Sequence, residues 1–146
     1  MPYFKHSILL FLLLLPMLMV AQNQSGEASP VEIGRQLLRE GKVGPAVEQL
    51  DSALSANPDD AEAVHLRGRA AFIDKDLDTA IQYFDRALVL EPDLAEAYHD
   101  RGLVWFGRKE TERACNDFAA AADLGNTKAC SAHTTLCASA TGFTED

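Results

Sequence analysis

Residues 61–93 read AEAVHLRGRAAFIDKDLDTAIQYFDRALVLEPD, and this stretch decides the fold. In its first half, the apolar and small residues follow the i, i+4, i+7, i+8 spacing of one helical face: Val64, Gly68, Ala71 and Phe72. A second apolar face of the same kind runs from Ala80 to Leu88. Polar residues dominate the four positions between these halves, 73–76. The pattern predicts a helix, a short turn and a second helix.

The same pattern recurs 34 residues away on both sides. Four sets of residues keep this spacing of 34: Gly34, Gly68 and Gly102; Ala46, Ala80 and Ala114; Leu50, Phe84 and Phe118; and Ala53, Ala87 and Ala121. A fixed period of this length predicts stacked copies of one helical unit. Glycine inside a helix costs about 1 kcal/mol relative to alanine, so its recurrence indicates a steric requirement. We expect Gly68 to pack closely against Ala80.

Helix starts are also indicated by the sequence. Ser29 and Glu32 form a capping-box pattern around Pro30, and Asp59 with Glu62 and Asp93 with Glu96 repeat that spacing. Asp78 precedes the second apolar face and is a candidate N-cap.

Residues 27–126 resemble three tetratricopeptide repeats, at about 27–60, 61–94 and 95–126. The matching signature residues include Gly34, Ala46 and Pro58, then Gly68, Phe84 and Pro92, then Tyr98, Gly102, Trp105 and Phe118. The resemblance implies an all-α fold, an α-solenoid of antiparallel helix pairs in a right-handed superhelix of about seven helices. The repeat domain would run over 30–138, with a capping helix at 127–138 and a flexible tail at 139–146.

Proteins of this family hold a peptide or helix of a partner protein in a concave groove lined by the first helix of each repeat. By register, the resemblance implies that Leu38 and Ile73 face the groove together with ten candidate partner-binding residues, which are Arg35, Arg39, Glu62, His65, Arg69, Phe72, Glu96, His99, Leu103 and Phe106. Phe72 and Phe106 are candidate aromatic anchors, or they are buried against neighbouring helices. Arg35, Arg39 and Arg69 would form a basic strip in the groove, which favours a ligand with carboxylates. The alternative is that these arginines are only solvated. The lysine and asparagine set by which chaperone-binding members grip a C-terminal carboxylate is not evident.

Three cysteines, Cys115, Cys130 and Cys137, lie near the C-terminal end of the repeats. Cys130 and Cys137 are seven residues apart on one predicted helix, about 10 Å along its axis, which is too far for a disulfide. If the last repeat helix and the capping helix turn near Gly125, Cys115 and Cys137 come level. We predict a Cys115–Cys137 disulfide with Cys130 as a buried thiol; three reduced cysteines are the alternative.

The first 21 residues carry a separate signal. Residues 8–21, ILLFLLLLPMLMVA, are almost wholly apolar and follow Lys5. This run is short for a membrane span, which needs about 20 residues, and is typical of a secretory signal peptide. We predict a signal peptide over 1–21 with cleavage after Ala21, or an uncleaved anchor, followed by a linker at 22–29. The protein is therefore expected to be exported, either periplasmic or secreted.

The formal net charge of −9 argues against nucleic acid as a partner, because phosphate binding needs a basic face. A phosphate-binding loop, a serine elbow and a metalloprotease helix are not found in the sequence, so we expect neither an enzyme nor a cofactor. His65 and His99 are equivalent residues of neighbouring repeats, but packed helices lie about 8–10 Å apart and zinc sites need three or four ligands, so no metal site is expected.

The sequence thus predicts an exported adaptor or scaffold that binds a peptide or helix of a partner protein, with membrane contact only through an uncleaved leader. The alternative is a structural or self-associating component of an envelope assembly, which would use its edge or convex face.

Overall fold

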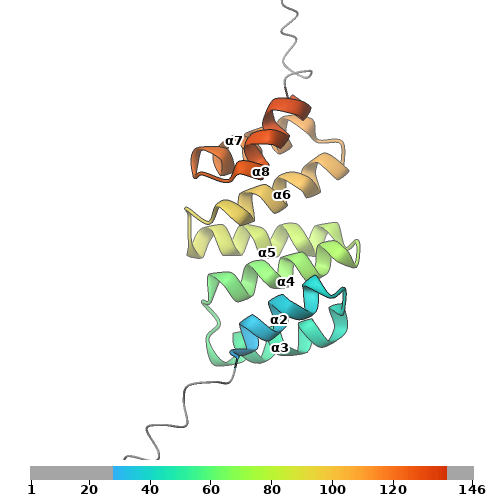
Figure 1. Ribbon diagram of the computed structural model, residues 1–146, viewed down its shortest axis with the longest axis vertical. Coiled ribbons are helices and arrows are strands. Elements are labelled where there is room, and N and C mark those ends of the chain that lie inside the picture. The colour runs from blue at the N-terminus through green and yellow to red at the C-terminus, as the bar shows by residue number, and fades with distance from the viewer. Residues whose placement is uncertain (1–27, 138–146) are drawn as a thin grey trace, which may run out of the picture.

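The computed structural model describes residues 28–137, and every regular element in that range is a helix (Figure 1). The seven α-helices are α2 (Pro30–Arg39), α3 (Val43–Ala56), α4 (Ala61–Ile73), α5 (Leu77–Leu90), α6 (Ala95–Gly107), α7 (Thr111–Asp123) and α8 (Thr127–Ala132), and a π-helical turn, η1 (His133–Cys137), continues α8. The predicted all-α solenoid of about seven helices is confirmed. The predicted signal peptide and flexible tail, and all but the end of the linker, lie outside the described residues. None of the helices within 28–137 has the length and apolar character needed to cross a membrane.

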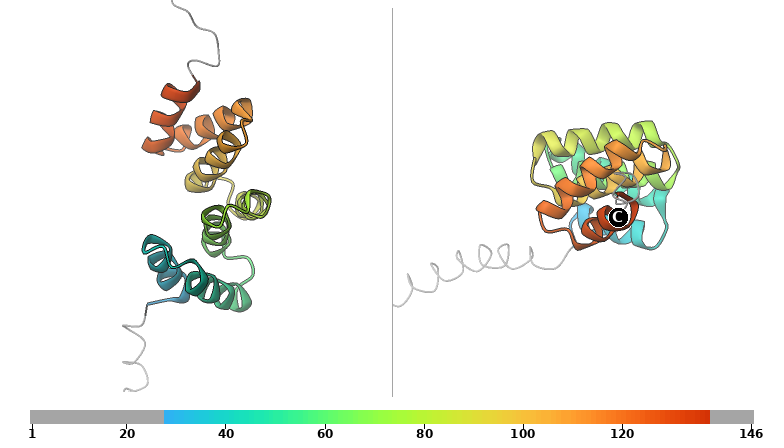
Figure 2. Two further views of the ribbon diagram at one scale, coloured as in Figure 1. Left: turned by 90° about the vertical axis from the view of Figure 1, so that its right-hand side faces the viewer. Right: turned by 90° about the horizontal axis from the view of Figure 1, so that it is seen from above.

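The helices pack as three pairs, α2 with α3, α4 with α5 and α6 with α7, and each pair stacks on the next. The first helices of successive pairs also contact one another, α2 with α4 and α4 with α6. Figure 2 shows that the stack is curved, with α2 and α8 projecting on the same side. The first helices therefore share one face of the solenoid.

The recurring glycines are explained by a bulky side chain sixteen residues later. A Cβ atom on Gly68 would lie 2.6 Å from the Phe84 ring, and one on Gly102 would lie 2.7 Å from the Phe118 ring. In the first pair, Gly34 faces Leu50 in the same way, at 2.8 Å. The atoms nearest to the Gly68 position belong to Phe84 and Tyr83, and in the first pair the carbonyl oxygen of Ala46, the equivalent of Ala80, lies 3.5 Å from the Gly34 position. The glycine makes room for a buried ring.

Two of the predicted helix starts are displaced along the chain. The Ser29–Glu32 capping box is confirmed, with both reciprocal hydrogen bonds formed. The cap of α4 is Asp60 instead of Asp59, because residues 58 and 59 are used by the turn that leads into the helix.

Similarly, the cap of α5 is Asp76 instead of Asp78, and it accepts a hydrogen bond from the amide of Thr79. At α6, the N-cap position belongs to Leu94, which makes no side-chain cap, so the predicted Asp93 cap was wrong.

The turn inside each pair has one left-handed residue, and these residues also follow the period of 34. Gly41 has φ of 73°, Lys75 of 64° and Lys109 of 62°. In each turn the next amide donates to a carbonyl five residues back, for example from Asp76 to Ala71 at 2.9 Å. Only the first copy has the residue type that this conformation favours.

Arginines tie successive pairs together on the side away from the shared face. Arg67 of α4 bonds Asp51 of α3 at 2.6 Å, and one period later Arg101 of α6 bonds Asp85 of α5 at the same distance. Arg101 also makes two parallel hydrogen bonds to the buried Asp117, at 2.8 and 2.7 Å. Its bonds to Asp117, and secondarily to Asp85, raise the pKa of Arg101 above its ordinary value in spite of partial burial.

The last helix covers the end of the stack and is held there by a disulfide. Cys115 of α7 and Cys137 of η1 are bonded, with their Cα atoms 5.7 Å apart. Cys130 is exposed, so its prediction as a buried thiol was wrong. The buried residue of α8 is its neighbour Ala129, and a step of one residue around a helix turns the side chain away from α7.

Candidate binding groove

Two adjoining hollows run along the face shared by α2, α4 and α6. The first, of about 540 Å³, is lined by residues of α2, α4 and the turn and first residues of α6. The second, of about 350 Å³, is lined by residues of α4, α6 and the turn and first residues of α8. His65, Arg69 and Glu96 border both hollows, which makes them one continuous depression. We call the two hollows together the binding groove.

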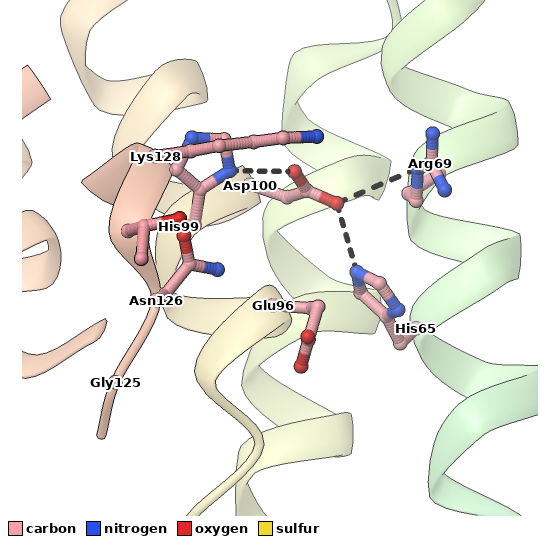
Figure 3. Close-up of a pocket in the computed structure, with 9 residues that line it drawn as sticks. His65, Arg69, Glu96, His99, Asp100, Gly125, Asn126 and Lys128 are labelled. Carbon is pink, nitrogen blue, oxygen red and sulfur yellow. Dashed lines mark hydrogen bonds and ion pairs between the residues drawn. The ribbon is translucent and has the colours of Figure 1, made fainter. Parts of the chain in front are cut away.

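Asp100 is the centre of the groove's polar contacts (Figure 3). One carboxylate oxygen lies 2.8 Å from Nε2 of His65 and 3.5 Å from Nε of Arg69, and the other lies 3.1 Å from Nδ1 of His99. A single carboxylate therefore links α4 and α6 and fixes three of the side chains that border the groove.

The imidazole rings of His65 and His99 each pack against a buried phenylalanine ring. His65 lies against Phe84 with ring centroids 5.7 Å apart, and His99 lies against Phe118 at 6.0 Å. Because each phenylalanine is wedged against a periodic glycine, the packing that forms the repeat also positions the imidazole. Within the described part of the chain, no group of three or more His, Cys, Asp or Glu residues is arranged to hold a metal ion.

The contacts of Asp100 control its ionisation. Burial alone would raise the pKa of this carboxyl, but hydrogen bonds from His65 and His99 outweigh it, and the Arg69 charge adds to them. The net result is a pKa well below the ordinary aspartate value of 3.8. Asp100 is therefore a fixed negative charge in the groove, and it is already occupied by protein donors.

The remaining cations of the groove differ in whether they are paired. Arg35 forms an ion pair with Glu62. Among residues 28–137, Arg39 and Lys128 have no carboxylate within ion-pair distance, although both line the groove. Their charges are available to a ligand. Glu91 and Glu96 are likewise unpaired within that range and give the groove an acidic side.

Seven of the ten predicted groove residues line the binding groove: Arg35, Arg39, Glu62, His65, Arg69, Glu96 and His99. The three apolar ones do not line either hollow. Phe72 is half-buried against the cluster around Phe84, and Leu103 is half-buried against the cluster around Phe118. Phe106 is 42 % exposed at the far end of α6.

The groove residues that sequence reasoning missed include Asp100, Asn126 and Lys128. A signal for Asp100 did exist, because the equivalent residue one repeat earlier is Leu66, which is buried. A carboxylate at such a position needs partners, and the histidines nearby can supply them. Asn126 and Lys128 belong to the turn and first residues of α8, at the edge of the three repeats, where the period makes no prediction.

Comparison with known proteins supports this fold. Residues 31–95 match the family model described as tetratricopeptide repeat. Over these residues the chain is similar to tetratricopeptide repeats. The chain matches no curated protein.

Several solved tetratricopeptide-repeat structures share the fold. The first such domain of Spaghetti (RPAP3), bound to the HSP90 peptide SRMEEVD, is 22% identical with a TM-score of 0.69, and the match covers 77% of this chain and 91% of that one. The first such domain of human RPAP3 is also 22% identical, with a TM-score of 0.70 and 77% and 90% coverage. MamA is 25% identical with a TM-score of 0.60, over 66% of this chain and 56% of MamA.

Proposed function

We propose that this protein is an exported tetratricopeptide-repeat adaptor that holds an extended segment of a partner protein in the binding groove. The observation that carries the proposal is the continuous groove with two cations, Arg39 and Lys128, that have no ion-pair partner among residues 28–137. Proteins of the same fold are known with peptides bound, namely the HSP90 peptide SRMEEVD and the HSP70 peptide SGPTIEEVD. The apolar run over residues 8–21 supports export.

The chemistry of the groove indicates the kind of segment that it holds. Asp100 already binds three protein side chains. The charged groups left for a ligand are therefore the cations of Arg39 and Lys128 and the carboxylates of Glu91 and Glu96. A segment with charges of both signs fits this surface, and charge complementarity would set its register.

The test is a charge reversal in the groove with a matched control. The full-length protein, tagged and expressed in its native host, is compared with an Arg39→Glu/Lys128→Glu variant in affinity purification. The control is Lys75→Glu/Lys109→Glu, which changes the net charge by the same amount in two exposed turns that do not line the groove. We expect a partner that is retained by the wild type and the control and is lost from the groove variant.

The other outcomes contradict the proposal. A partner that survives the groove reversal binds elsewhere. Recovery of the protein itself as the main species, unchanged by the reversal, favours the structural or self-associating role. Export is tested separately by the intact mass of the protein isolated from its host, which should begin at Gln22. A full-length mass in the cytoplasmic fraction would contradict export.

A further inference from the structure

The second hollow of the groove depends on the position of a short terminal segment, α8 with η1. The turn before α8 and its first residues, Gly125 to Lys128, supply part of the lining of this hollow, and the rest comes from α4 and α6. Figure 3 shows Gly125 and Asn126 on one side and His65 and Arg69 on the other. The residues that line the first hollow all lie within 35–96. Displacement of α8 would therefore open the second hollow and leave the first one intact.

The packing that attaches this segment to the repeats is slight. Both α8 and η1 pack on α7. Within residues 127–137, only Ala129 and Cys137 are buried, whereas α4 alone buries seven residues. The hydroxyls of Ser131 and Thr134 donate to carbonyls of α8 itself. Noncovalent packing therefore holds α8 and η1 less firmly than it holds the helices of the repeats.

The disulfide strengthens this attachment. Cys137 is the last residue of η1, and its bond to Cys115 of α7 joins residues 22 apart in the chain. A cross-link of this span restricts the detached state and disfavours detachment on the order of 100-fold. The oxidation state of the two cysteines thus controls how firmly α8 stays beside the groove.

We propose that the Cys115–Cys137 disulfide is a redox switch for the second hollow of the groove. With the disulfide formed, α8 keeps Asn126 and Lys128 in the lining of the hollow. After reduction, α8 and η1 detach, the hollow opens to solvent and Lys128 no longer contributes its charge, while the first hollow persists. This inference rests on the proposed function, because the switch acts on the binding of the same partner.

The switching step is a thiol–disulfide exchange with a dithiol reductant. Cys115 is half-buried and Cys137 is buried, so a thiolate of the dithiol attacks Sγ of Cys115. The bond between the two cysteine sulfurs breaks, and Cys137 leaves as a thiolate that takes up a proton. The second thiol of the reductant then attacks the mixed disulfide. The two protons of the dithiol end on Cys115 and Cys137, and the reductant leaves as a cyclic disulfide.

Hydrogen exchange of the full chain, with and without dithiothreitol, measures the detachment. Amides of residues 130–137 should exchange at least about tenfold faster in the reduced protein, while those of α4 and α5 stay unchanged. Cys115→Ser/Cys137→Ser should exchange fast in both conditions, and Cys130→Ser, the matched control, should behave as the wild type. Equal exchange of residues 130–137 in both conditions would overturn the switch. Equal acceleration in all helices would also overturn it, because the disulfide would then stabilise the whole fold.

Fluorescence energy transfer reports the position of α8 directly. Trp105 is the only tryptophan of the chain and packs against the cluster that contains Cys137. Cys130 is the only cysteine outside the disulfide and is exposed, so it can carry a dansyl group as the acceptor. Transfer from Trp105 should be largely lost when dithiothreitol is added. Unchanged transfer would overturn the detachment.

The effect on the groove is tested by affinity purification from the native host. The partner that Arg39→Glu/Lys128→Glu loses should also be lost from Cys115→Ser/Cys137→Ser and retained by Cys130→Ser. Retention by Cys115→Ser/Cys137→Ser would overturn control of the groove by the disulfide. If α8 detaches on reduction but no partner depends on the groove, the proposed function fails and the detachment stands. If the partner depends on the groove but α8 stays in place on reduction, the switch fails and the proposed function stands.

Discussion

The periodic glycines make a quantitative prediction, best developed for Gly68. A Cβ atom at this position would lie 2.6 and 2.7 Å from two carbons of the Phe84 ring and 3.1 Å from Cβ of Tyr83, whereas ordinary contact begins at 3.4 Å. The ring would have to move by about 0.8 Å, and it is fully buried. Overpacking of this kind costs about 1–3 kcal/mol, and the crowding by Tyr83 puts this site at the upper end. The higher helix propensity of alanine offsets about 1 kcal/mol of this cost. Gly68→Ala should therefore lower the free energy of unfolding by about 1–2 kcal/mol.

The matched control is Gly44→Ala. Gly44 is also in a helix, but nothing lies within 4 Å of the Cβ atom that alanine would add. This substitution should leave stability unchanged or raise it by up to about 1 kcal/mol. The assay is urea unfolding followed by far-ultraviolet circular dichroism. If Gly68→Ala is as stable as Gly44→Ala, the glycine is not present to admit the ring, and the steric explanation of the recurring glycines is wrong.

Three further predictions concern the end of the stack, the turns and the groove. The disulfide joins residues 22 apart in the chain, so its loss in Cys137→Ser should lower the free energy of unfolding, measured in urea, by about 3 kcal/mol. Cys130→Ser changes an exposed thiol and should lower it by less than about 0.5 kcal/mol. Equal effects of the two substitutions would contradict the cross-link as the cause. Lys75→Gly should stabilise the protein by about 0.5–1 kcal/mol, because lysine is disfavoured at φ of 64° and the flexibility of glycine offsets only part of that gain; a loss of stability in the same assay would contradict this. The folded-state pKa of Asp100 lies below its ordinary value of 3.8, so its ionised form stabilises the fold above that pH, and this contribution is lost as the pH falls further. Unfolding measured from pH 5 to pH 2 should show a shallower decline for Asp100→Asn than for wild type, and parallel curves would refute the role of its contacts.

Much of the fold could be predicted because its determinants are local and repeated. The spacing of apolar residues from Val64 to Leu88 fixes two helical faces, and the period of 34 copies them. The register of the family resemblance placed Arg35, His65 and Arg69 in the groove, and they do line it. Local reasoning failed at helix starts, where Pro58 and Asp59 form the turn and the cap is therefore Asp60.

The groove itself was less accessible to sequence reasoning, because its contacts join helices that are far apart in the chain. His65 meets Asp100 across 35 residues, and a helical pattern does not specify which side chain of the next helix faces it. The apolar candidates show the same limit. Phe72 shares a face with Arg69 by spacing, yet packing with the neighbouring helix turns it partly into the core.

The sequence by itself determined the helix pairs, their number and their stacking, because the 3.6-residue helical repeat and the 34-residue period are properties of the chain. The tertiary structure alone decided that Phe84 fills the space left by Gly68, that Asp100 links two histidines and that Arg39 and Lys128 lack a carboxylate partner within residues 28–137. These contacts depend on how one helix is rotated and tilted against the next. That orientation is set by the packing of the whole core.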